Sequence, residues 1–90
     1  MRIIEKEVSK VLKDDSNTFQ NYLNFLEKEG GRLDNDNIVI DLSEVEKIEM
    51  RELLHLLPWS EQHRDRGRSF VIVAKGFSAS EVPDELIVVP

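Results

Sequence analysis

Ile-Val-Ile-Asp-Leu, residues 38–42, is a nearly continuous run of apolar side chains. Runs of this kind are expected where a strand is covered on both faces, as in parallel sheets. Two similar runs follow along the chain, Phe-Val-Ile-Val-Ala at residues 70–74 and Leu-Ile-Val-Val at residues 86–89. The three runs therefore predict three strands of one mostly parallel sheet.

The segment between the first two runs, residues 50–66, predicts a helix that ends before Gly67. Four leucines indicate that this helix is buried over a wide arc: Leu53, Leu54, Leu56 and Leu57. We expect Leu53 and Leu57 in particular to pack against the sheet. Pro58 removes one helical hydrogen bond, so we expect either a kink there or a new first turn that begins at the proline.

A second helix is predicted upstream, over residues 16–29. Its apolar residues Phe19, Tyr22, Leu23 and Leu26 follow the i, i+3, i+4, i+7 spacing of a single stripe. The side chains of residues 14–17 are candidates to cap its first turn, and the glycines at 30–31 are expected to end it. The partial alternation of residues 2–13 predicts a half-exposed strand or hairpin at one side of the sheet.

The order of these segments defines the expected fold. Strand, helix, strand, helix, strand, strand predicts an α/β fold with right-handed crossovers and a mostly parallel sheet of four or five strands. The helices are expected to pack mainly on one face of that sheet. Ninety residues leave no room for a second core, so residues 1–90 are predicted to form a single domain.

The composition excludes several classes of protein. Twelve basic against 18 acidic side chains give a net charge of −6, which opposes nucleic-acid binding through phosphate neutralisation. No apolar run approaches the ~20 residues that cross a bilayer, and the first residues lack the apolar centre of an export signal. Cysteine is absent, which fits a reducing compartment. We therefore expect a cytoplasmic protein without membrane insertion.

A family resemblance lies in residues 38–48, which read Ile-Val-Ile-Asp-Leu-Ser-Glu-Val-Glu-Lys-Ile. An apolar strand that ends in Asp-Leu-Ser, a short turn with an apolar residue and a following helix resemble the second half-repeat of STAS domains. This module is shared by sulphate transporters and anti-sigma factor antagonists. Residues 66–73 are similar to the family's glycine-containing turn and next strand. The resemblance, which covers residues 37–74, implies a STAS-like fold and a bacterial regulatory protein.

The chain departs from that family at the start of its second helix. Antagonists typically carry Asp-Ser-Ser-Gly there, and the partner kinase phosphorylates the first serine. This chain has Glu49, Met50, Arg51 and Glu52 instead. Met50 has no hydroxyl group, so the phosphorylation switch cannot operate at that position. The closing helix of the family is also missing before Pro90, which would leave one face of the sheet bare unless a partner or a further tail covers it.

The resemblance implies a non-catalytic interaction module that binds a protein partner. That partner would be an anti-sigma-type kinase, a transporter subunit or another regulator. The predicted binding surface combines the turn after the first apolar run with the helix start. It comprises Asp41, Leu42, Ser43, Glu49, Met50, Arg51, Glu52 and His55.

Other interpretations of these residues stay open. Glu49 and Glu52 could simply stabilise the positive end of a helix, and an alternative function is a small enzyme that uses Glu49, Glu52 or His55. A structural subunit of a larger assembly is a third possibility. His55 and His63 stand ~12 Å apart along a helix, too far to share a metal ion, so no metal or other cofactor is predicted. Trp59 is either a core residue or a partner anchor.

Overall fold

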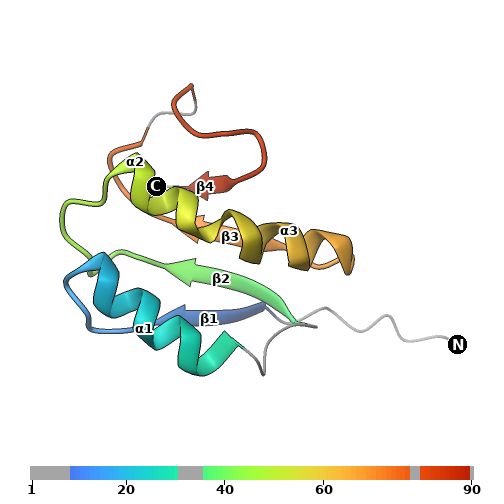
Figure 1. The fold of residues 1–90 in the computed structure, drawn as a ribbon, viewed down its shortest axis with the longest axis horizontal. Coiled ribbons are helices and arrows are strands. Elements are labelled where there is room, and N and C mark those ends of the chain that lie inside the picture. Colours follow the sequence, from blue (N-terminus) through green and yellow to red (C-terminus); the bar gives the residue numbers. More distant parts are fainter. Residues whose placement is uncertain (1–8, 31–35, 78–79, 90) are drawn as a thin grey trace, which may run out of the picture.

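The computed structural model describes residues 9–30, 36–77 and 80–89, which form four strands, three α-helices and one 3-10 turn (Figure 1). Strand β1 (Ser9–Lys13) is followed by helix α1 (Phe19–Gly30) and strand β2 (Asn37–Asp41). Helix α2 (Met50–Leu53) then continues through the 3-10 turn η1 (Leu54–Leu56) into helix α3 (Leu57–Asp65). The described chain closes with strands β3 (Phe70–Val73) and β4 (Ile87–Val89).

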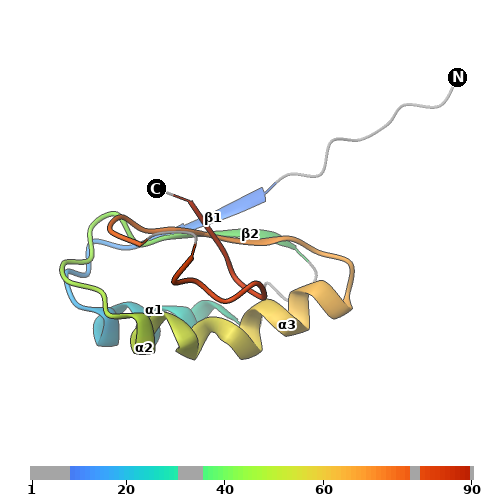
Figure 2. The ribbon, with the colours of Figure 1, turned by 90° about the horizontal axis from the view of Figure 1, so that it is seen from above.

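The four strands form one sheet in the order β1-β2-β3-β4, and every neighbouring pair is parallel. Each strand therefore lies beside the next one in the chain, so all crossovers step in the same direction. Figure 2 shows the sheet nearly edge-on, with α1, α2 and α3 on the same side of it. The predicted α/β fold, with a mostly parallel sheet and helices on one face, is confirmed. Residues 2–8 of the predicted first strand lie outside the described residues.

Helix α1 forms where the apolar stripe predicts it, but a different residue caps it. Phe19, Tyr22 and Leu26 are buried against the sheet, while Leu23 is half-buried. The Thr18 hydroxyl accepts a hydrogen bond from the Asn21 backbone N–H at 3.3 Å. The expectation that a side chain of residues 14–17 caps this helix is therefore wrong. Thr18 stands one position before the helix and three before that N–H, which is the spacing an N-cap requires.

The second helical region changes its geometry before Pro58. The 3-10 turn η1 separates α2 from α3, and the proline occupies the first turn of α3, where its missing N–H has no intrahelical partner to lose. The predicted new first turn at the proline is confirmed, although α3 begins one residue earlier, at Leu57.

The burial of the four leucines differs from the expectation of a wide buried arc. Leu53 and Leu56 are fully buried, Leu57 is half-buried and Leu54 is 37% exposed. The tighter 3-10 turn rotates the following residues relative to an uninterrupted α-helix, so Leu56 takes the inward position that was expected for Leu57. The helix therefore presents a narrow apolar stripe to the sheet.

One core fills the space between the sheet and the helices. Its fully buried aliphatic residues come from both layers: Leu26, Ile38, Ile40, Leu42, Leu53, Leu56 and Ile72. Two polar groups are satisfied inside it. The Tyr22 hydroxyl donates a hydrogen bond to the Leu12 carbonyl, and His63 Nδ1 lies 2.8 Å from the Trp59 carbonyl oxygen. The connection from β3 to β4 is tied to the helical layer, since the Ser60 hydroxyl donates to the Glu85 carbonyl at 3.2 Å.

Candidate functional site

The charged residues at the start of α2 make local contacts with one another. The Glu49 backbone N–H donates to a Glu52 carboxylate oxygen at 2.8 Å, which satisfies one of the free amides at the start of the helix. Arg51 Nε lies 2.8 Å from a Glu49 carboxylate oxygen, and both side chains are more than half exposed. The interpretation that Glu49 and Glu52 stabilise the start of the helix thus has direct support. Arg51 and Glu49 also remain accessible to a partner.

The other half of the predicted surface follows strand β2. The Asp41 carboxylate accepts a hydrogen bond from the Ser43 backbone N–H at 2.9 Å, which closes a tight turn. Hydrogen bonds from the Ser43 hydroxyl and backbone N–H hold the pKa of Asp41 below its ordinary value. Leu42 is fully buried. Of this half of the surface, Ser43 is the exposed residue.

The remaining predicted residues lie along the helical layer. Met50 is half-buried and packs against the core. His55 is exposed, and its ring lies 6.4 Å from that of Phe19 at the start of α1. The accessible part of the predicted surface is therefore formed by Ser43, Glu49, Arg51 and His55, with Asp41 and Glu52 partly exposed.

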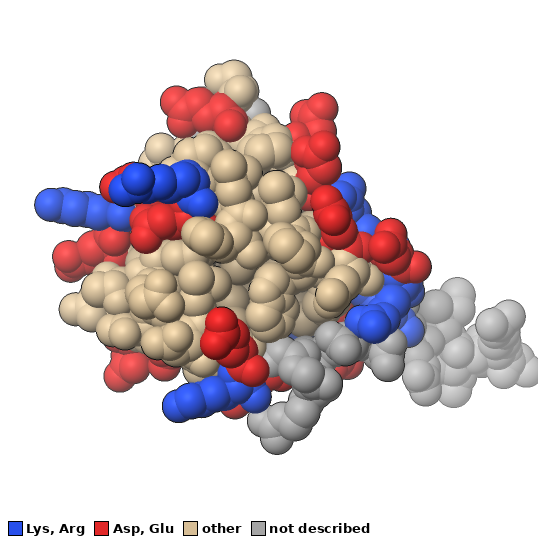
Figure 3. Space-filling model, viewed as in Figure 1, with Lys and Arg blue, Asp and Glu red and all other residues tan. Residues whose placement is uncertain are grey.

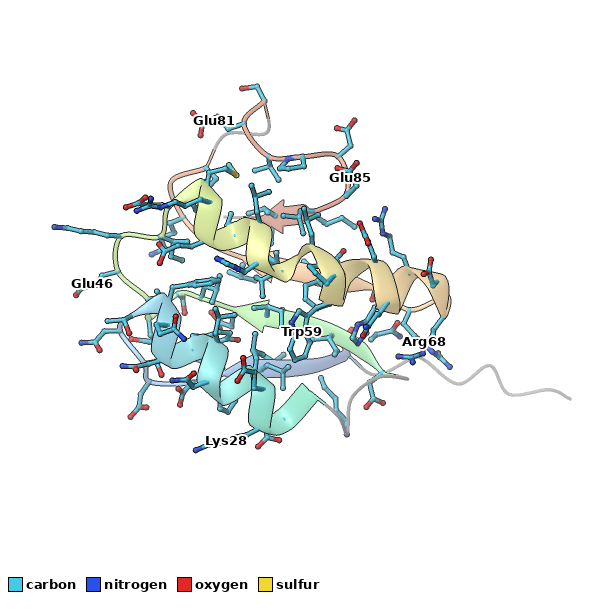
Figure 4. The ribbon with its side chains drawn as sticks, in the orientation of Figure 1. Lys28, Glu46, Trp59, Arg68, Glu81 and Glu85 are labelled. Carbon is cyan, nitrogen blue, oxygen red and sulfur yellow. The ribbon has the colours of Figure 1, made fainter. Side chains whose placement is uncertain are left out.

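The helical side of the molecule carries an uncharged centre with charged residues around its margin (Figure 3). Trp59 lies within this centre, between α1 and α3 (Figure 4), and it is half-buried and packs against the core. A half-buried Trp that contacts the core contributes mainly to the stability of the fold. The accessible part of its ring is also the kind of group that anchors partners.

The opposite side of the sheet is the most unusual surface of this protein. Strand pairing places four apolar residues in one row across all four strands: Val11, Val39, Val71 and Ile87. A second row, two residues further along each strand, contains Lys13, Asp41, Val73 and Val89. We call these two rows the open face, because none of the described helices lies on that side of the sheet (Figure 2).

The side chains of the open face are partly or largely accessible to solvent. Val11 is 60% exposed, Ile87 is 51% exposed and Val89 is 38% exposed. Apart from Leu54 on the helical side, these are the only large apolar side chains of the described residues that are this exposed. All-parallel sheets are normally covered on both faces. Within the described chain, this sheet therefore has an exposed, largely apolar face that no helix covers.

Sequence reasoning overlooked a pocket at the carboxyl ends of β2 and β3. It has a volume of about 310 Å³, and its lining includes Leu42, Ser43, Lys47 and Lys75. The lysines gave no signal in the sequence because they stand in different loops. Only the parallel pairing of β2 with β3 brings the two loops to the same edge of the sheet.

The described residues contain no cluster of three His, Asp or Glu side chains arranged to hold a metal ion. Over the same residues, no helix has both the length and the apolar character needed to cross a membrane. Comparison with known proteins gave no match among family models, curated proteins or solved structures. The fold and the site define a small α/β domain with a parallel sheet, and functional inference rests on its surfaces.

Proposed function

We propose that this protein is a non-catalytic, cytoplasmic interaction module, a STAS-like regulatory or adaptor domain that binds a partner protein. The observation that carries the proposal is the open face. Val11 and Ile87 lie at the two ends of an apolar row, and each exposes more than half of its surface. Covering them removes apolar area from water, which contributes about 25 cal/mol per Å².

The size of the open face favours one amphipathic helix of a partner protein as its occupant. Four strands that are three to five residues long and spaced ~4.8 Å apart present a surface of roughly 14 Å by 10–17 Å, or at most about 240 Å² in projection. Stable interfaces take about 800 Å² of accessible surface from each partner, so this face alone is too small for a permanent dimer of two copies. An α-helix is ~10 Å wide and rises ~15 Å in ten residues, which matches the surface.

This size also favours a regulatory module over a structural subunit. Permanent assemblies bury interfaces of ~2,000 Å² or more, whereas small interfaces belong to transient complexes. The open face supports a role as a structural subunit only if a second surface of the protein also takes part in the interface. The accessible residues at the start of α2, Glu49 and Arg51, are the candidates for such an extension. An enzyme based on Glu49, Glu52 and His55 has less support, because the two carboxylates are engaged in the contacts of the helix start.

The test of this function is a charged substitution on the open face. Replacing Val11 and Ile87 with Lys should preserve the fold, since changes at exposed positions typically alter stability by ~0.5 kcal/mol or less. The same change should weaken binding of the native partner at least tenfold, because two buried ammonium groups would oppose the apolar contact. The measurement is quantitative affinity capture from the native cell, followed by titration of the recovered partner against each variant.

Two matched variants locate the contact. Replacing Glu49, Arg51 and Glu52 together with Ala tests the start of α2, and the same change at Glu27, Lys28 and Glu29 in α1 serves as the control. We expect the control to bind normally and the α2 variant to bind more weakly through slower association. Normal binding by the open-face variant would contradict the proposal. Sedimentation of the unaltered protein as a dimer that the open-face variant abolishes would identify a second copy as the occupant instead.

A further inference from the structure

The pocket at the carboxyl ends of β2 and β3 contains none of the open-face residues and none of residues 49–52, but it includes Leu42 and Ser43 of the predicted binding surface. Its apolar lining comes from Leu42, Val45 and Ile48, of which the first two are buried and the third packs against the core. Lys47 and Lys75 contribute exposed ammonium groups. A volume of about 310 Å³ is at the lower end of the range for small-molecule sites.

One residue of the pocket lining adopts a backbone conformation that costs free energy. Lys47 has φ of 51°, and it is the only residue other than glycine in the described chain with a positive φ. A long side chain in this region is uncommon, and such conformations tend to persist at functional sites. Gly76, on the other side of the pocket, has φ of 89°, which glycine adopts without strain. The two loops are thus fixed in tight turns that bring their lysines to one pocket.

The charges of these lysines are not neutralised within the described part of the chain. Lys10 pairs with Asp36, Lys13 pairs with Glu44 and Arg51 pairs with Glu49. Neither Lys47 nor Lys75 has a carboxylate within ion-pair distance there. The Asp41 carboxylate, on the residue before Leu42, is turned back onto Ser43. Two lysines without a carboxylate partner in the described chain thus line one pocket of a protein of net charge −6.

We propose that this pocket binds a small ligand that carries one oxyanion, a carboxylate or a phosphate monoester, on an apolar body. The ammonium groups of Lys47 and Lys75 would hold the oxyanion as charge-assisted hydrogen-bond donors. The apolar body would lie against Ile48 and Val45, with the buried Leu42 beneath them. Both parts of the ligand are needed, because an exposed lysine pair alone holds an anion weakly in water.

The test uses benzoate and phenyl phosphate as probes, with benzyl alcohol as an uncharged comparison of similar shape. Each is titrated into the full chain, and backbone amide shifts are followed by NMR. We expect both anions to shift the amides of residues 42–48 and 75–77 with a Kd of about 1 mM or tighter, and benzyl alcohol to bind more weakly. Phenyl phosphate and benzoate distinguish phosphate from carboxylate recognition.

The matched variants separate recognition from folding. Lys47→Asn removes the charge and keeps a residue that tolerates positive φ, and Lys75→Gln removes the second charge. Together they should weaken anion binding at least tenfold and leave binding of benzyl alcohol unchanged. Lys28→Gln, on the exposed side of α1, should change neither.

Absence of saturable shifts, or equal binding by the double variant, would overturn the proposal. So would equally tight binding of benzyl alcohol, because the lysines would then play no part. None of these outcomes bears on the open face, so capture of the protein partner tests the proposed function independently.

Discussion

Replacing Leu53 with Ala is expected to lower the free energy of unfolding by about 2–5 kcal/mol. Leu53 ends α2, has no exposed surface and belongs to the core between the helical layer and the sheet. The truncation loses the transfer free energy of the removed methyl and methylene groups and leaves a cavity that the surrounding residues fill only partly. For a 90-residue domain this is a large share of the total stability. Chemical denaturation at equilibrium measures it.

The matched control is Leu57→Ala in the same helical region. Leu57 is half-buried, so the same truncation removes less buried surface there and should cost about half as much or less. Leu54→Ala, at a side chain that is 37% exposed, should be milder still. Equal losses at Leu53 and Leu57 would mean that the 3-10 turn does not separate their orientations in solution. A loss below ~1 kcal/mol at Leu53 would contradict its place in the core.

The leucines also show how far the sequence predicts this fold. Periodicity locates both helical regions and the strands, because burial of an apolar stripe decides where a helix lies. It assigned Leu54 and Leu57 to the buried arc together with Leu53 and Leu56, because the pattern assumes a uniform helix. The 3-10 turn before Pro58 changes the rotation per residue at that point. The position of the proline predicts a break in the helix. Which side of the helix is buried after that break depends on packing.

The apolar strands illustrate a second limit. Val39 and Val71 belong to apolar runs that are typical of strands covered on both faces. The sequence does not show what covers the second face. In the described chain it is the pairing register that aligns Val11, Val39, Val71 and Ile87 into one row. The lysine pocket depends on tertiary structure in the same way. The candidate surface at the start of α2 was named from the family resemblance, and its partner contacts stay a prediction.

Tyr22 offers a test of the contact between α1 and β1 that is independent of the leucines. Its side chain is fully buried, and its hydroxyl donates a hydrogen bond to the Leu12 carbonyl at the edge of the sheet. Tyr22→Phe keeps the ring and removes the donor, which leaves that carbonyl without this partner. We expect the free energy of unfolding at neutral pH to fall by about 1–3 kcal/mol, the cost of an unsatisfied buried polar group.

The pH dependence gives this prediction a second readout. Burial first, and then the charge of Asp41, raises the pKa of Tyr22 well above its ordinary value in the folded protein. A raised folded pKa means that the stability contribution is fully present below pH ~10 and is lost as pH rises further, by about 1.4 kcal/mol per pH unit. Phenylalanine does not titrate, so the stability difference between the two proteins should narrow above pH ~10.

Tyr22 is the only tyrosine of the chain, so ultraviolet absorbance follows its ionisation directly. The folded protein should show no tyrosinate at pH ~10, where an exposed tyrosine is half-ionised, and the signal should appear together with unfolding. The Phe variant supplies the baseline. Ionisation of Tyr22 near pH 10 in a protein that is still folded would mean that water reaches the hydroxyl. The helix α1 would then be less tightly docked on β1 than its buried stripe implies, and the cost of Tyr22→Phe should fall to a few tenths of a kcal/mol.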